Sequence, residues 1–369
     1  MSGMEFALRI SRLPIYPVAS GYDLGDEVAM LASNETPFAP LASVGEAAYR
    51  AVQGANRYPD PSYSPLRKAL SDRYGIPEAR IALGNGSCEL LMCAGEALLE
   101  PGAEVVYAWP AFSVYPHLAA ASGAKEIPVD LDDGHCHVLD AMLAEITVAT
   151  RLVLVCNPNN PTSTALPLEE IEAFLDRVPK YVCVVLDEAY CEFSLALGDT
   201  YASVELLRRH PNLVILRTFS KVYGLAGLRV GYGLCGSPEF RTAVDQLRQP
   251  FFVNVAAHAA ATEALRHQDE VERRVTETIA QRQPLVAGVR ELGLWVAESD
   301  ANFIWLALPD GADESDVVTG LLQRGVLVRA GGSLGNPGHL RVTVGTGADN
   351  ATFVTALGEL VQAPAARGA

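Results

Sequence analysis

The chain has 369 residues, of which 49% are hydrophobic and 7% aromatic, and it carries a formal net charge of −16. This length exceeds the size at which a single hydrophobic core usually keeps growing, so we expect two domains. The acidic balance argues against nucleic acid and anionic membranes as partners, because both require a basic surface. No stretch approaches 18 unbroken apolar residues, and the N-terminus lacks an apolar run with a cleavage site. We therefore expect a globular protein with small-molecule partners.

The cysteines and lysines narrow the chemistry further. The seven cysteines are scattered, form no Cys-x-x-Cys pair, and several lie in apolar runs, where cysteine packs as a small hydrophobic residue. This usage indicates a reducing compartment, the cytoplasm, and not a disulfide framework. Only four of the 28 basic residues are lysines. Lys68, Lys125 and Lys180 lie in polar surroundings typical of solvated surface, which leaves Lys221 as the candidate amine nucleophile.

The first 290 residues alternate between helical and strand patterns after an irregular, Pro-rich arm at residues 1–42. In chain order, the periodicity predicts helices over 43–53 and 66–74, a strand over 80–83, a helix over 89–99 with Ser87 as its N-cap, a strand over 104–109, a helix over 117–122, a strand over 151–156, a helix over 168–177, strands over 181–186 and 213–216, and helices over 238–248 and 256–291. Apolar strands that alternate with helices indicate a mostly parallel sheet flanked by helices.

From about residue 293 the pattern changes. Strands are predicted at WVAE (295–298), ANFIWLAL (301–308) and HLRVTVGT (339–346), with helices over 314–324 and 350–361. This mixture indicates a small α+β domain. We therefore divide the chain into an N-terminal arm and part of the small domain (1–42), a large α/β domain (43–285) and a small C-terminal α+β domain (286–369).

Five predicted strand ends carry side chains of different chemistry. Because ligands in open α/β sheets collect outside the carboxyl ends of the strands, these side chains are expected to lie close together. In chain order they are a helix N-terminus suited to an anion (Gly86, Ser87, Cys88), an aromatic ring (Phe112, with Tyr115 beyond), amides (Asn157, Asn159, Asn160), a carboxylate with a phenol (Asp187, Tyr190) and an amine with hydroxyls (Thr218, Ser220, Lys221).

Lys221 has the strongest context of these residues. It follows a buried strand and two hydroxyl residues, and Arg229 comes eight residues later. Hydroxyls and an arginine can hold a phosphate, and an amine beside a phosphate site suits covalent catalysis through a Schiff base. Pyridoxal 5'-phosphate (PLP) needs both, together with a carboxylate for its ring nitrogen and an aromatic face for its ring. Each residue also has a simpler interpretation: a loop lysine, Asp187 as a helix cap, Phe112 as core.

Three other motifs compete with this interpretation. VCVVLDEAY resembles a Walker B strand, but none of the lysines lies in a phosphate-binding GxxxxGK[ST] loop. GYGLCG matches GxGxxG at residues 231–236, without a suitable acidic residue about 20 positions later. His135-Cys136-His137 suggests a metal ligand pair, but DDGHCHV has no second pair nearby and is interpreted as a solvated loop. We therefore expect no metal.

Taken together, the motifs resemble those of the fold-type-I PLP-dependent aminotransferases, specifically the histidinol-phosphate aminotransferase family and its phenylalanine and aromatic aminotransferase relatives. The resemblance covers most of the chain, through LASNETPF, RYPD, GNGSCE, PAFSVY, NPNNPTST, LDEAY, RTFSKVYGLAGLRVGY, ANFIWL and LRVTVGT. The chain departs from the family pattern in three places: Cys88 stands where the family usually has Asp, Phe112 stands where Tyr is frequent, and NPTS replaces the commoner NPTG. The NPNNPTST form is like the phenylalanine-type relatives, whereas GNGS and PFFVNVAA are like the histidinol-phosphate branch.

The resemblance assigns roles residue by residue. It implies that Lys221 is the Schiff-base lysine, that Asp187 pairs with the ring nitrogen, and that Tyr190 completes the catalytic group. It implies cofactor contacts from Asn160 and Tyr190 to the 3-oxygen, from Phe112 by stacking, and from Gly86, Ser87, Cys88, Thr218, Ser220 and Arg229 to the phosphate. Tyr58 resembles the tyrosine that reaches the phosphate from the other subunit of a homodimer. Tyr16, Asn34, Arg329 and Arg341 match substrate-side positions.

The function implied is transfer of an amino group from L-histidinol phosphate to 2-oxoglutarate, a ping-pong transamination. Phenylalanine or another aromatic amino acid is the alternative donor. Two other interpretations stay open: different PLP chemistry on the same fold, such as decarboxylation or elimination, and a non-catalytic protein that reuses the fold.

Overall fold

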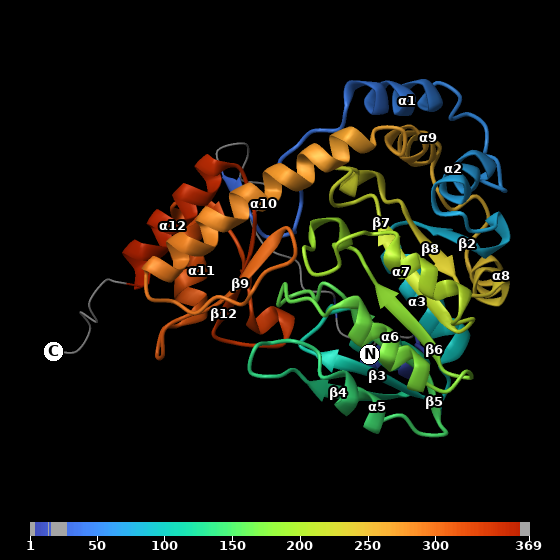
Figure 1. Ribbon diagram of the computed structural model, residues 1–369, viewed down its shortest axis with the longest axis horizontal. Coiled ribbons are helices and arrows are strands. Elements are labelled where there is room, and N and C mark those ends of the chain that lie inside the picture. Colours follow the sequence, from blue (N-terminus) through green and yellow to red (C-terminus); the bar gives the residue numbers. More distant parts are fainter. Residues whose placement is uncertain (1–3, 14, 16–27, 362–369) are drawn as a thin grey trace.

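The computed structural model describes residues 4–13, 15 and 28–361 (Figure 1). Its strands are β1 (Ala29–Met30), β2 (Ile81–Gly84), β3 (Glu104–Trp109), β4 (Lys125–Asp130), β5 (Thr150–Cys156), β6 (Cys183–Asp187), β7 (Leu213–Thr218), β8 (Gly231–Cys235), β9 (Phe303–Ala307), β10 (Val326–Leu327), β11 (Arg329–Ala330) and β12 (His339–Thr343). Its α-helices are α1 (Ala42–Val52), α2 (Ser64–Tyr74), α3 (Ser87–Leu98), α4 (Tyr115–Ser122), α5 (Leu139–Ala144), α6 (Leu168–Arg177), α7 (Ala202–Glu205), α8 (Pro238–Leu247), α9 (Val255–Ala264), α10 (Gln268–Glu291), α11 (Glu314–Gln323) and α12 (Gly347–Val361). Within these residues no helix is long and apolar enough to cross a membrane.

A seven-stranded sheet forms the larger part of the molecule (Figure 1). Its strand order is β2-β8-β7-β6-β5-β3-β4. The pairs from β7 to β4 are parallel, and β8 is antiparallel to both of its neighbours. The predicted α/β fold with a mostly parallel central sheet is therefore confirmed.

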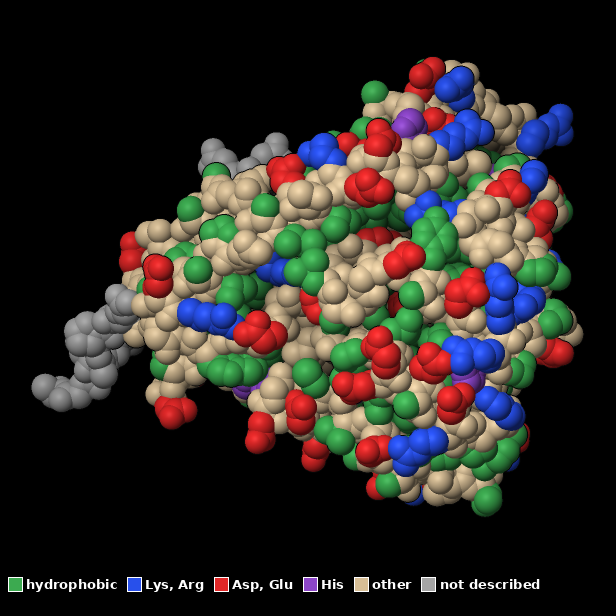
Figure 2. Space-filling view, viewed as in Figure 1, with side chains coloured by type: hydrophobic (Ala, Val, Ile, Leu, Met, Phe, Trp, Pro, Cys, Tyr) green, Lys and Arg blue, Asp and Glu red, His purple; other side chains and the backbone are tan. Residues whose placement is uncertain are grey.

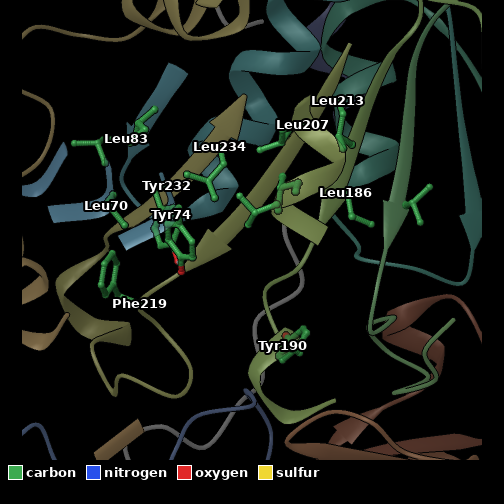
Figure 3. Close-up of a cluster of buried hydrophobic side chains, with 14 of the residues drawn as sticks. Leu70, Tyr74, Leu83, Leu186, Tyr190, Leu207, Leu213, Phe219, Tyr232 and Leu234 are labelled. Atoms are coloured by element: carbon green, nitrogen blue, oxygen red, sulfur yellow. The ribbon is translucent and has the colours of Figure 1, made fainter. Parts of the chain in front are cut away.

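Alternate residues of the strands enter two apolar cores, one on each face of this sheet. In β3, Val106 and Ala108 join one core, whereas Val105 and Tyr107 join the other, as expected for side chains that alternate across a pleated strand. Helices α2, α6 and α9 pack on the first core, part of which is shown in Figure 3. Helices α3, α4 and α8 pack on the second core. The continuous apolar strands of the sequence are thus buried on both faces.

A second, smaller sheet has the antiparallel order β11-β12-β9. Its core is shared with α11, α12 and the C-terminal part of α10, on the left of Figure 1. The N-terminal strand β1 pairs in parallel with β10, so residues 29–30 belong beside this C-terminal sheet. The 24-residue helix α10 runs from the neighbourhood of α9 to the small sheet. The predicted boundary at residues 285–286 falls inside α10, and the division into domains stays a prediction.

Several local expectations differ from the structure, and the helix predicted over 256–291 is two helices, α9 and α10. Strand β4 was not predicted, because KEIPVD is a polar, largely exposed strand at the sheet edge, where charged side chains are common. WVAE forms only an isolated bridge between Val296 and Leu306. Gly86 is the N-cap of α3, and Ser87 is the first helical residue. The HCH segment is not a solvated loop, since His137 is buried.

The charged side chains on the surface are consistent with the acidic composition of the chain. On the face shown in Figure 2, Asp and Glu side chains are spread over both parts of the molecule, with Lys and Arg side chains among them. Lys68, Lys125 and Lys180 are exposed, as predicted.

A buried ion pair supports the carboxyl ends of β6 and β7. Nη2 and Nε of Arg217 on β7 donate to Oε2 of Glu188 at 2.7 and 2.9 Å, and each side chain is only 1% exposed. Further donations from Arg217 reach Ser203 and the Thr200 carbonyl. Glu188 directly follows the last residue of β6, so this pair fixes the start of the loop beyond that strand.

Replacing Glu188 by Leu is expected to lower the free energy of unfolding by about 3–5 kcal/mol, because the Arg217 charge stays buried without its partner. The double variant Glu188→Leu/Arg217→Met is expected to recover most of this loss. Urea unfolding of both variants at pH 7 measures the difference. A single variant within about 1 kcal/mol of wild type would contradict the assigned role of the pair.

Candidate active site

A cavity of about 400 Å³ opens at the carboxyl ends of β5, β6 and β7. The three strand-terminal residues Cys156, Asp187 and Thr218 all line it. The predicted site residues that it brings together are Asn34, Ser87, Cys88, Phe112, Asn160, Asp187, Tyr190, Thr218, Ser220, Lys221, Arg229, Arg329 and Arg341. The residues from five strand ends therefore meet in one place, as the parallel sheet predicts.

The amine of Lys221 lies in the middle of this set. Its Nζ donates to the Ser33 carbonyl at 3.0 Å and lies 5.5 Å from the centre of the Tyr190 ring. Burial lowers the pKa of Lys221 to about 7, and the positive charges of Arg341 and Arg229 act in the same direction. A large fraction of this amine is therefore neutral, and so nucleophilic, near neutral pH.

Asp187 is the carboxylate of the cavity floor. It ends β6 and is buried. Burial raises the pKa of Asp187 to about 6, against the effect of hydrogen bonds from the Ala189 amide at 3.3 Å and the Tyr115 hydroxyl at 3.4 Å. A cationic group placed beside Asp187 would offset this desolvation.

One end of the cavity is built for an anion. Oγ1 of Thr218 donates to Oγ of Ser220 at 2.9 Å, and Nη1 of Arg229 donates to the same Ser220 oxygen at 3.3 Å. Helix α3 begins at Ser87 on this side, and its first amides point out of the helix. The Glu89 carboxylate does not occupy that end, because it turns back to accept from the Asn85 amide at 2.6 Å.

Gly86 makes the close approach to Arg229 possible. It has a φ of +75°, and a Cβ at this position would lie 2.4 Å from Nη2 of Arg229. The sequence prediction counted Gly86 among the cavity residues. Gly86 does not itself line the cavity but lies against the Arg229 guanidinium that does, and its contact with the cofactor phosphate stays a prediction.

The opposite end of the cavity carries two more arginines. Arg329 and Arg341 face each other as cross-strand partners of β11 and β12. Nη1 of Arg341 donates to Oδ1 of Asn160 at 2.6 Å, and its Nη2 donates to the Ala32 carbonyl at 2.6 Å. The small sheet therefore contributes cationic side chains to a cavity whose floor belongs to the large sheet.

Asn34 links the N-terminal segment to this end. Its Nδ2 donates to the Tyr190 hydroxyl at 3.1 Å, and its backbone amide donates to Oγ1 of Thr343 at 2.9 Å. Burial raises the pKa of Tyr190 above its ordinary value, so this phenol stays protonated at neutral pH.

Two predicted residues lie elsewhere. Tyr58 is 79% exposed, stacks on Phe251 with ring centres 4.4 Å apart, and does not line the cavity of its own chain. Tyr16 lies outside the described residues.

The structure also adds residues to which the sequence patterns assigned no role. Ser33 and Glu35 flank Asn34 in the cavity wall, and Ser113 and Cys156 line it further on. Tyr115 reaches Asp187. The sequence places Tyr115 just beyond the end of β3, and this position could have identified it as a residue of the site.

Acetylation of the ligand-free protein is expected to modify Lys221 with a pH midpoint near 7, because burial favours the neutral amine. The exposed Lys68 is the internal comparison, since its hydrogen bond to Asp72 raises its pKa above that of an ordinary lysine. Peptide mass spectrometry after brief exposure to acetic anhydride at pH 5 to 10 measures both lysines in one sample. Parallel profiles for Lys221 and Lys68 would contradict the assigned environment.

Comparison with known proteins gives a consistent result. The family model of the class I and II aminotransferases matches residues 26–357. The chain is 44% identical over 356 residues to histidinol-phosphate aminotransferase 2 of Ralstonia nicotianae, covering 96% of this chain and 94% of the relative. It is 46% identical over 329 residues to the aromatic amino acid aminotransferase of Thermobifida fusca, covering 89% of each.

Solved structures agree with these relatives. The crystal structure of histidinol-phosphate aminotransferase from Sinorhizobium meliloti, in complex with pyridoxal-5'-phosphate, superimposes with a TM-score of 0.85 at 29% identity, covering 96% of this chain and 97% of that one. The cavity, its lysine and its buried carboxylate thus lie in a fold of known class, and the chain belongs to the class I and II aminotransferase family.

Proposed function

We propose that this aminotransferase uses PLP to transfer the amino group of L-histidinol phosphate to 2-oxoglutarate, with Lys221 and Asp187 as the central catalytic residues. The observation that carries the proposal is the meeting of a desolvated amine, a buried carboxylate and an anion-binding end in one cavity. The relatives named above include a solved structure in complex with PLP.

The cavity residues fit PLP at each of its functional groups. The phosphate of PLP suits the end of the cavity where the side chains of Thr218, Ser220 and Arg229 lie beside the start of α3. The close contact at Gly86, where a side chain would displace the Arg229 guanidinium, is what a phosphate cradle requires. Phe112 supplies a ring for stacking, and Asn160 and Tyr190 supply polar groups for the 3-oxygen. Cys88 is expected to contribute its backbone amide.

The chain's own residues divide the proton chemistry between them. When bound, PLP supplies an electron sink for negative charge that develops at the substrate α-carbon. Lys221 would hold the cofactor through its amine, and the same amine would take and return a proton at the substrate α-carbon. Its pKa of about 7 suits both directions at neutral pH. Asp187 stabilises positive charge at the ring nitrogen.

The two arginines of the small sheet support a doubly anionic substrate. Arg229 is assigned to the cofactor phosphate, so Arg329 and Arg341 remain to bind the substrate. A phosphate monoester or a second carboxylate can accept from both guanidinium groups. L-Histidinol phosphate has the first of these groups and 2-oxoglutarate the second.

An aromatic amino acid is the second candidate donor. Relatives described as aromatic amino acid aminotransferases are 44–46% identical to this chain, as close as the histidinol-phosphate relatives. Phe112 and Leu334 supply apolar wall to the cavity. The single carboxylate of such a donor needs only one of the two arginines, Arg329 or Arg341, as its ion-pair partner.

We further propose a homodimer in which Tyr58 reaches the phosphate end of the partner's cavity. Its exposure, and its stacking on the partly exposed Phe251 away from its own cavity, support this role. A cytoplasmic location is proposed as well, in keeping with seven cysteines that are all free.

A panel of amino donors tests the function directly. With 2-oxoglutarate as acceptor, kcat/KM for L-histidinol phosphate is expected to exceed that for L-phenylalanine at least about tenfold, because a phosphate monoester can accept from both guanidinium groups with up to two negative charges, whereas the carboxylate of phenylalanine has one. Lys221→Ala is expected to lose about 10³-fold or more in turnover, whereas Lys180→Ala should keep wild-type rates. A higher kcat/KM for phenylalanine would contradict the proposed donor and make an aromatic amino acid the donor. Loss of donor without matching glutamate formation would indicate a decarboxylase or lyase.

Gly86→Ala is expected to raise the Kd for PLP roughly 10- to 100-fold, because the new Cβ displaces Arg229 from its charge-assisted contact. Gly75→Ala is the matched control, since Gly75 has a similar φ of +65° but no atom within 4 Å of the added Cβ. Gly75 is in the left-handed helical region, where alanine costs about 1–2 kcal/mol. Gly86, with a ψ of 167°, is in a region populated almost only by glycine, where the cost is about 1–3 kcal/mol. Gly75→Ala therefore controls for a positive φ, and only Gly86→Ala should weaken cofactor binding. Fluorescence titration with PLP measures it, and equal Kd values for the two variants would count against a phosphate site there.

A further inference from the structure

His137 is a buried histidine whose two ring nitrogens lack hydrogen-bond partners of ordinary geometry among the residues that the structure describes. Its side chain is 6% exposed and belongs to the loop between β4 and α5. Within the described residues, neither ring nitrogen has a hydrogen-bond partner of ordinary geometry, and the same holds for Oδ1 of Asn159. The two side chains are in contact: Asn159 acts to raise the pKa of His137, although burial outweighs it and brings that pKa to about 4. His137 is therefore neutral at physiological pH.

The chemistry of the two groups is complementary. A neutral imidazole has one N–H donor, and a carboxamide oxygen can only accept. Both donors on Nδ2 of Asn159 are already in use, because this atom lies 3.1 Å from the Pro110 carbonyl and 2.8 Å from Oγ1 of Thr162. The open oxygen of Asn159 therefore needs a donor, and the adjoining ring of His137 supplies one. Unpaired buried polar atoms are unfavourable, so pairing these two adjoining groups lowers the free energy of the buried site.

The carboxamide of Asn159 lies at the junction of two cavity loops. Pro110 comes two residues before Phe112, and Asn159 directly precedes Asn160. One side chain thus connects the loop of the expected ring-stacking residue to the turn of the expected 3-oxygen contact.

The His137 loop is bound to that turn by a second route. Oγ1 of Thr164 donates to the His135 carbonyl at 2.8 Å, and Thr162 and Thr164 share a hydrogen bond of 2.9 Å. The backbone of the turn closes on itself through the Asn159 amide and the Thr164 carbonyl at 2.8 Å. In the described part of the chain, the charged group that acts on His137 is Asp132, and its Oδ1 accepts from the amides of Gly134 and Cys136.

We propose that His137 is a positioning residue, whose ring N–H holds the Asn159 carboxamide in the orientation that ties the Phe112 loop to the Asn160 turn. If the N–H is lost, the carboxamide oxygen stays buried without a donor, and only the two Nδ2 contacts still orient the group. The link to Pro110 is then weakened, and with it the common support of the stacking ring and the amide. The proposal rests on the cofactor roles proposed for Phe112 and Asn160.

The variant His137→Phe keeps a buried ring but removes the donor. In the holoenzyme, we expect the pH midpoint of the bound cofactor's absorbance to move by about half a pH unit or more, and the Kd for PLP to rise roughly tenfold. His137→Gln restores a donor and is expected to bring both values back toward wild type. The matched control is His210→Phe. His210 is also buried but precedes β7 at the opposite end of the sheet, so this variant should lower stability without moving either cofactor value.

A measurement on the unmutated ring covers the case in which His137→Phe does not fold. In ¹⁵N-histidine-labelled protein, we expect one ring to keep a single neutral tautomer down to about pH 5, with a slowly exchanging N–H that is lost in Asn159→Leu. Wild-type cofactor values in His137→Phe, or a His137 ring N–H that exchanges freely with solvent, would overturn the proposal. Neither readout depends on which donor the enzyme uses, so a failed donor assignment leaves this test intact.

Discussion

Desolvation of Lys221 and Asp187 in one cavity is the constraint on which the site depends. Burial disfavours the charged form of each group, so it lowers the pKa of the amine to about 7 and raises that of the carboxyl to about 6. Two groups that are ordinarily far apart in acidity come to titrate in the same narrow range. A nucleophilic amine and a carboxylate that still accepts a cation can then exist together at neutral pH.

The sheet makes this arrangement possible because it ends its strands at one edge. Asp187 is the last residue of β6 and pairs in register with Cys156 on β5 and Leu216 on β7, so its position is fixed by backbone hydrogen bonds on both sides. Glu188, the next residue, turns away into the ion pair with Arg217. Two consecutive carboxylates thus have different surroundings: Glu188 is matched by a permanent cation, and Asp187 lines the cavity.

Much of this arrangement can be predicted from the sequence, for a physical reason. Strands buried on both faces have a continuous apolar pattern, and their polar successors must lie at the carboxyl edge, so the sequence alone groups Asp187, Asn160, Thr218 and Lys221. The same reasoning misses β4, because an exposed edge strand needs no apolar pattern. It assigns the cap of α3 wrongly to Ser87, since the close approach of Arg229 that selects glycine at residue 86 is a tertiary contact. The burial of His137 likewise depends on the turn that contains Asn159, and no local pattern includes that contact.

The side chains that line the cavity are mainly basic, whereas the whole chain is acidic. Three arginines, Arg229, Arg329 and Arg341, and the partly protonated amine of Lys221 line it together with the carboxylates Glu35 and Asp187, while the chain carries a net charge of −16. A cationic cavity with low-dielectric walls concentrates small anions, and an acidic exterior disfavours large polyanions. Arg229 belongs to the large sheet's end of the cavity, whereas Arg329 and Arg341 come from the small sheet. An anion held between the two ends would therefore contact side chains of both sheets at once.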